Sequence, residues 1–139
     1  MQITTFDDLI AAGHDQAAPQ RFLFVFLKTV LAKDHSSSEA RDFEAGSGGS
    51  LSAIMSLDRR LDELSDFSSI KTEADGLSQD WDKMLVACMS GDNGRMPTAE
   101  QAEEPLKRMI AEVETGGDLS RYICFDRQGV PLQFESRAN

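Results

Sequence analysis

The sequence MLVACM at Met84–Met89 is followed directly by the polar sequence SGDNGR at Ser90–Arg95. Six consecutive apolar residues leave no polar face, so the first segment is predicted to be a strand that is covered on both sides. The polar segment contains two glycines and leads to a helix that begins near Thr98. A strand, a turn and a helix start in this order place backbone N–H groups where they can surround an anion. The junction is therefore the strongest candidate for a site in the chain.

The segments before this junction predict a helix, two strands and a second helix. Thr5–Gly13 has a capping threonine, acidic residues in its first turn and a glycine at its end, as in a short helix. Arg21–Leu27 carries aromatic and β-branched residues without polar alternation, which is typical of a buried central strand. Leu51–Leu57 is predicted to be a second strand, and Arg59–Leu64 a helical turn. A helix capped by Ser65 follows, with apolar residues at intervals of three and four.

The segments after the junction predict a long helix and a hairpin. The helix begins at Thr98, and Pro105 inside it predicts a kink or a restart. Tyr122–Phe125 and Val130–Phe134 flank a tight turn and predict a β-hairpin. Because Pro131 cannot donate a hydrogen bond to a ladder, the last strand is expected at a sheet edge.

Together these elements predict a single α+β domain over residues 1–139, with a mixed sheet of about five strands flanked by three to four helices. The order strand, helix, strand, helix, strand over 51–125 predicts two right-handed crossovers and partly parallel pairing. Residues 33–50 are rich in serine and glycine, and we expect a mobile loop there. The chain has 40% hydrophobic and 27% charged residues, which is a globular balance.

Charge and hydropathy exclude several classes of protein. The chain carries 14 basic and 24 acidic residues, a net charge of −10. Nucleic acids and anionic membrane surfaces bind clustered Lys and Arg, so we expect neither as a partner. The longest fully apolar runs, such as Phe22–Leu27, have six residues, far fewer than the roughly 20 that span a bilayer. The N-terminus has no basic start and no long apolar stretch, so we expect a cytoplasmic protein.

The residue types of catalytic and metal sites are sparse and scattered. Cys88 and Cys124 lie in separate apolar segments, where buried, reduced thiols are favoured over a disulfide or a redox site. No Cys/His cluster has zinc spacing, so we expect no metal and no cofactor. His14 and His35 each lie beside an aspartate in a polar connection, where a surface position is favoured over a general-base role. Trp81 is interpreted as a core or edge anchor rather than as a stacking platform.

The loop at 90–98 has two interpretations. As a ligand site, Arg95 clamps an anion, while the glycine N–H groups and the Thr98 hydroxyl donate hydrogen bonds. As a structural turn, the glycines serve only its dihedral angles, and Asp92 and the absence of a phosphate-loop motif favour this second interpretation. The candidate ligand-binding residues are Ser90, Gly91, Asn93, Gly94, Arg95 and Thr98.

Four segments carry a resemblance to a known group of proteins: PQRFLFVF at Pro19–Phe26, GGSL at Gly48–Leu51, PLKRM at Pro105–Met109 and FDRQG at Phe125–Gly129. Over most of its length the chain resembles small proteobacterial proteins that are labelled ribonucleotide reductase subunit alpha. A reductase catalytic subunit is a far larger barrel enzyme with a radical-forming cysteine and a redox-active cysteine pair. Two cysteines in separate segments, and less than one barrel's length, do not fit that activity.

Two functions remain open. The leading hypothesis is a cytoplasmic accessory or protein-interaction domain without catalytic activity, because the charge is −10 and no catalytic constellation is visible. Such a domain would bind a protein partner through its acidic surface and the 33–50 loop. The alternative is a small anionic-ligand-binding or enzymatic domain with its site at the 90–98 loop. The sequence leaves the oligomeric state open.

Overall fold

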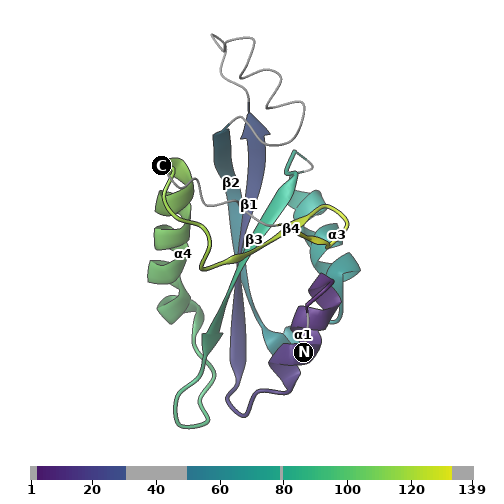
Figure 1. The fold of residues 1–139 in the computed structure, drawn as a ribbon. Coiled ribbons are helices and arrows are strands. Elements are labelled where there is room, and N and C mark those ends of the chain that lie inside the picture. The colour runs from purple at the N-terminus through teal and green to yellow at the C-terminus, as the bar shows by residue number, and fades with distance from the viewer. Residues whose placement is uncertain (1–2, 31–49, 79, 133–139) are drawn as a thin grey trace.

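The computed structural model describes residues 3–30, 50–78 and 80–132. The elements are α1 (Phe6–His14), β1 (Gln20–Val30), β2 (Ser50–Arg60), the 3-10 helix η1 (Leu61–Glu63), α3 (Phe67–Leu77), β3 (Lys83–Ser90), α4 (Ala99–Glu114), β4 (Ile123–Asp126) and β5 (Pro131–Leu132). The strands form one sheet in the order β2-β1-β3-β4-β5. Figure 1 shows α1 and α3 on one face of this sheet and α4 on the other.

The predicted α+β single-domain fold is confirmed, with three helices and five strands in the described residues and a C-terminal strand pair. The predicted parallel pairing is wrong, because every pairing in the sheet is antiparallel. β2 and β3 do run in the same direction, since both are antiparallel to β1, but β1 lies between them. The crossover through α3 therefore joins two parallel strands that never form a common ladder.

β1 separates two layers of core. Its phenylalanines pack on the side of α1 and α3, and its aliphatic residues pack on the side of α4. The first group is Phe22, Phe24 and Phe26, the second is Leu23, Val25 and Leu27, and all six are 0% exposed. Side chains of a strand alternate between its two faces, so a strand that is covered on both faces reads as an unbroken apolar run. The prediction of a buried central strand is confirmed.

β3 is covered on both faces only over its first half. Met84, Leu85 and Val86 are buried, whereas Cys88 is exposed. The prediction is therefore right for the first three residues and wrong for the rest. Beyond Val86 the cover is incomplete, because Cys88 borders a small hollow that Leu9, Ala12 and Gly13 of α1 also line. Cys124 is buried as expected, and Trp81 is 1% exposed, in agreement with its interpretation as a core anchor.

Tertiary packing moves some element boundaries from their predicted places. α1 has the predicted cap at Thr5, but it continues through Gly13, which packs against η1. A Cβ on Gly13 would lie 2.9 Å from a methyl carbon of Leu61, so this glycine serves close packing rather than helix termination. Arg59 belongs to β2 and not to the predicted helical turn, which is reduced to η1.

Two helices also differ from prediction in detail. Asp66, and not Ser65, caps α3, because its side chain accepts the hydrogen bond from the backbone N–H of Ser69. α4 continues through Pro105 without a restart. The predicted loop at 33–50 lies outside the described residues, apart from Ser50 at the start of β2. No helix in the described ranges is long and apolar enough to cross a bilayer.

Candidate functional site

The connection from β3 to α4 contains a tight reverse turn at Asp92–Arg95. Asn93 and Gly94 both have positive φ, 54° and 75°, and the backbone N–H of Arg95 donates to the carbonyl oxygen of Asp92 at 3.0 Å. Two central residues with positive φ are the signature of a type I′ turn, which explains the Asn-Gly dipeptide. Gly94 therefore serves the dihedral angles of the turn, as the structural interpretation of the loop requires.

Gly91 is also required by the turn. A Cβ at this position would lie 2.0 Å from the carbonyl oxygen of Arg95, so no other residue fits without a backbone shift. Its N–H donates to the carbonyl oxygen of Pro19 at 2.7 Å. This N–H is consequently engaged within the chain, and it is not free to bind an anion.

A pocket of about 490 Å³ lies between this turn and the start of α4. Five of the six predicted residues line it, namely Ser90, Gly91, Asn93, Arg95 and Thr98. Gly94 lines a separate groove on the other side of the turn. Gln101, which sequence reasoning missed as a site residue, completes the lining from the first turn of α4. Its capping-box position was the signal that could have found it.

The polar side chains of the pocket keep hydrogen-bond donors for a ligand. The Ser90 hydroxyl accepts from Gln20 Nε2 at 2.9 Å, and the Thr98 hydroxyl accepts from the Gln101 N–H at 3.0 Å. Each hydroxyl therefore still has its proton to donate. Gln101 Oε1 accepts from the Thr98 N–H at 2.9 Å, which directs its oxygen to the cap and leaves its NH₂ group as a donor.

The capping box limits what the helix end can offer. The N–H groups of Thr98 and Gln101 are both engaged within it. An anion at the end of α4 would find the N–H groups of Ala99 and Glu100, together with the positive end of a 16-residue helix. The helix end therefore contributes two N–H donors and a partial positive charge to the pocket, but it does not form a complete anion site by itself.

Two charged side chains give the pocket its polarity. Arg95 is exposed, and no ion pair of its guanidinium is found among the described residues. Asp92 lies on the same lining and opposes the positive charge. Arg95 and the helix end favour an anion, whereas Asp92 favours a ligand that also carries a hydrogen-bond donor.

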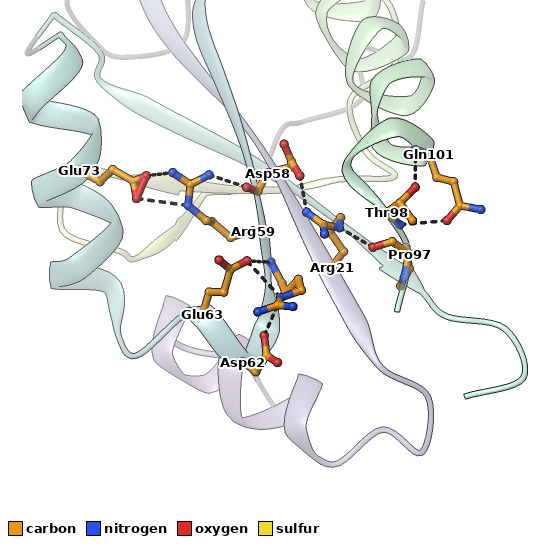
Figure 2. A network of polar contacts seen from close by, with 10 residues as sticks. Arg21, Asp58, Arg59, Asp62, Glu63, Glu73, Pro97, Thr98 and Gln101 are labelled. Carbon is orange, nitrogen blue, oxygen red and sulfur yellow. Dashed lines mark hydrogen bonds and ion pairs between the residues drawn. The ribbon is translucent and has the colours of Figure 1, made fainter. Parts of the chain in front are cut away.

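Arg21 holds the wall of the pocket in place from the sheet. It is 9% exposed, its Nε donates to the carbonyl oxygen of Pro97 at 2.6 Å, and it forms an ion pair with Asp58 of β2. Figure 2 shows this guanidinium between the two partners, beside the capping box of α4. Sequence reasoning missed Arg21, although a single arginine at the start of an apolar strand was a visible signal.

The thiols lie away from this pocket and are not activated. Burial raises the pKa of Cys124 to about 12. Cys88 is exposed in part, but it borders a small hollow with Leu9 and Phe22, and the loss of water around the sulfur raises its pKa to about 11. Both thiols are protonated at neutral pH, which disfavours thiol catalysis.

The groove on the other side of the turn has a volume of about 440 Å³. It lies between the C-terminal end of α1 and η1, and His14, Ala17 and Asp62 contribute to its lining. His14 is exposed as predicted, and His35 lies outside the described residues. In the part of the chain that the structure describes, no three His, Cys, Asp or Glu side chains are grouped to hold a metal ion.

No family model, no curated protein and no solved structure matches this chain. The resemblance to the small proteobacterial proteins therefore stays a prediction. The function is inferred from the geometry of the pocket beside α4 and of the groove beside α1.

Proposed function

We propose that this chain is a binding domain that holds a small anionic ligand in the pocket between β3 and α4. One observation supports the proposal: a pocket of about 490 Å³ occurs at the predicted turn, and its lining includes the Arg95 guanidinium and the hydroxyls of Ser90 and Thr98, which accept hydrogen bonds within the chain and keep their protons to donate. Small-molecule sites in proteins range from roughly 300 to 1,000 Å³, so the pocket has the size of such a site.

The donors fit a phosphate or carboxylate group. The Arg95 guanidinium supplies charge and a planar pair of N–H donors, and the Ser90 and Thr98 hydroxyls add neutral donors from two further directions. Hydrogen bonds of this kind are charge-assisted and are roughly twice as strong as neutral ones. Asp92 then selects ligands that carry a donor next to the anionic group.

The same residues favour binding over catalysis. Ser90 is the one hydroxyl at the end of the strand, and its hydrogen-bond partner is the amide of Gln20. An amide does not accept a proton near neutral pH, so Gln20 does not activate this serine as a nucleophile. The lining of the pocket contains neither histidine nor cysteine.

A thermal-shift titration with inorganic phosphate, acetate and a nucleoside monophosphate tests the proposal. At a ligand concentration of 100 times Kd the folded state gains about 2.7 kcal/mol, which for a chain of 139 residues raises Tm by about 8 °C. Arg95→Ala should remove most of this shift. Arg108→Ala, which removes an exposed arginine from α4, is the matched control and should respond like the wild type. If all three compounds leave Tm unchanged, or if Arg95→Ala keeps the full shift, the proposal fails.

A second function, that of a protein-interaction domain, is favoured by the groove beside α1. The groove lies at the negative end of α1 and includes Asp62, and the chain as a whole has a net charge of −10. These charges fit a basic segment of a partner protein. Ala17→Trp fills the groove, and Ala11→Trp adds the same bulk at an exposed position of α1 that does not line it. A partner that is captured by the wild type should be lost with Ala17→Trp and retained with Ala11→Trp. Equal capture by both variants would rule the groove out.

A further inference from the structure

The side chains of Asp92 and Arg95 lie on the same face of the turn that follows β3. The two residues pair across the turn as an antiparallel bridge, and the N–H of Arg95 donates to the carbonyl oxygen of Asp92 at 3.0 Å. Residues directly opposite each other in an antiparallel pair carry their side chains on one face, with Cβ atoms about 4.5–5.5 Å apart. Both residues line the pocket beside α4. A negative and a positive side chain are therefore neighbours on one wall of the pocket.

These two charges are not joined to each other. Every ion pair among the described residues involves other groups, and neither Asp92 nor Arg95 takes part in one. The remaining residues of the lining are uncharged, so the two charges of the pocket cancel. A simple anion at Arg95 would lie beside the Asp92 carboxylate, and like charges that face each other are unfavourable. The pocket is complementary to a ligand that carries one charge of each sign.

The connection that carries this pair is anchored on both sides. The N–H of Gly91 donates to the carbonyl oxygen of Pro19 at 2.7 Å, before the pair. After the pair, Nε of the buried Arg21 donates to the carbonyl oxygen of Pro97 at 2.6 Å. The fold thus fixes the backbone on either side of the two charges before a ligand binds, which reduces the cost of ordering the site.

The start of α4 indicates where the anionic group of the ligand binds. The Thr98 hydroxyl and the Gln101 side-chain oxygen accept hydrogen bonds within the capping box, so the hydroxyl proton and the NH₂ group remain as donors. Figure 2 shows these two side chains together at the helix end. Together with Arg95 they suit a carboxylate, whereas Asp92 suits an ammonium group, which carries N–H donors and no acceptor.

Building on the proposed function, we infer that the ligand is an α-amino acid, a zwitterion that carries its ammonium and carboxylate on the same carbon. The carboxylate binds Arg95 and the Thr98 hydroxyl, and the ammonium binds Asp92. Because the two charged residues are neighbours, they match a ligand whose two charges are also neighbours. Met89 and Met96 of the lining offer flexible apolar side chains, which favour an unbranched apolar side chain on the ligand.

Thermal-shift titrations with three compounds of equal carbon number test this inference. Norleucine is an α-amino acid with an unbranched side chain. Its isomer ε-aminohexanoate carries the same two charges at opposite ends of the chain, and hexanoate lacks the ammonium group. The wild type should bind norleucine about fivefold more tightly than either other compound, because only norleucine places both charges at adjacent positions.

Two aspartate variants locate the ammonium group. Asp92→Asn should weaken the binding of norleucine about fivefold and should strengthen the binding of hexanoate, because it removes both the partner of the ammonium and the repulsion of the carboxylate. Asp80→Asn removes an exposed carboxylate that does not line the pocket, and it should leave both affinities unchanged. A variant that only disturbed the turn would weaken both ligands alike, so the opposite signs identify the direct contact.

The outcomes separate this inference from the proposed function. Norleucine that binds no more tightly than hexanoate or ε-aminohexanoate, or an Asp92→Asn variant that weakens both ligands, would overturn the inference. Binding of phosphate or acetate without binding of norleucine would also overturn it, but the proposed function would stand. If no compound binds, both are wrong.

Discussion

Arg127, in the turn between β4 and β5, is expected to be a major contributor to stability. Its Nη2 lies 3.1 and 3.0 Å from the two carboxylate oxygens of Asp75 in α3, and its Nη1 donates to the carbonyl oxygen of Trp81 at 3.0 Å. The guanidinium carbon also lies 4.3 Å from the centre of the Trp81 ring. Asp75 in turn accepts from the indole N–H at 2.9 Å. One cluster thus joins α3, the start of β3 and the last turn.

The size of the effect follows from the exposure of the pair. The side chains of Arg127 and Asp75 are 29% and 24% exposed, so solvent weakens their ion pair but does not cancel it. We assign about 1 kcal/mol to the ion pair, about 1 kcal/mol to the bond with the Trp81 carbonyl and about 0.5 kcal/mol to the cation–π contact. Arg127→Ala should therefore lower the free energy of unfolding by about 2–3 kcal/mol. Asp75→Ala should cost a similar amount, about 2–3 kcal/mol, because it leaves the indole N–H without a partner.

Urea unfolding of the two single variants and the double variant measures the coupling. Trp81 is the only tryptophan in the chain, so its fluorescence reports on the cluster itself. The double variant should be less destabilised than the sum of the singles by about 1 kcal/mol, with unchanged m-values. Arg127→Lys keeps the charge without the planar fork and should fall between the wild type and Arg127→Ala. A coupling energy below about 0.3 kcal/mol would refute the assignment, because independent sites reach that value.

Three further predictions concern the turn, the first helix and the thiols. Gly94→Ala should lower the free energy of unfolding by about 1 kcal/mol, because residue 94 has a positive φ. Gly91→Ala should lower it more, because a Cβ at residue 91 meets a backbone carbonyl and one at residue 94 does not. Chemical denaturation of both variants checks this order. The pKa of Asp8 is lowered by its hydrogen bonds with Thr4 and then Thr5, so its contribution to stability is complete above its unfolded pKa and is lost as the pH falls through the folded pKa. Asp8→Asn should flatten the acid limb of Tm against pH, and an unchanged limb would contradict this capping role. Thiol labelling of the native protein at pH 7 should be slow at Cys88 and accelerate towards its pKa of about 11, whereas rapid labelling at pH 7 would show an activated thiol.

Local signals in the sequence were sufficient for the caps at Thr5 and Thr98, for a turn after β3 and for the central strand, but they placed the cap of α3 at Ser65 instead of Asp66. Thr5 and Thr98 act within a few residues of their own positions, and so does the Asn-Gly dipeptide at Asn93. Such features depend on residues that are close in the chain. The two caps were predicted correctly, and a polar turn with glycines was predicted at 90–95 without its type.

Features that depend on distant segments were missed. Arg21 bonds to residues that lie 37 and 76 positions away, and no local pattern indicates either partner. The insertion of β1 between β2 and β3 is likewise a choice among long-range pairings. Cys88 belongs to an apolar run, but its exposure is set by the hollow that it shares with residues of α1, which no local pattern indicates. A pocket lies at the loop that the sequence singled out, whereas the engagement of the Gly91 N–H by Pro19 required the fold to be known.

The side chains on the two faces of β1 differ in volume, and this difference specifies the register of β1 in the sheet. A strand with one polar face reveals a slip of one residue by exposing apolar groups to water. β1 has no polar face between Phe22 and Leu27, so a slip would leave every side chain buried. It would instead exchange three aromatic rings for smaller aliphatic groups on the side of α1, and crowd those rings against α4. Close packing tolerates neither the resulting void nor the overlap, so steric fit, and not water, specifies how this strand aligns with its neighbours.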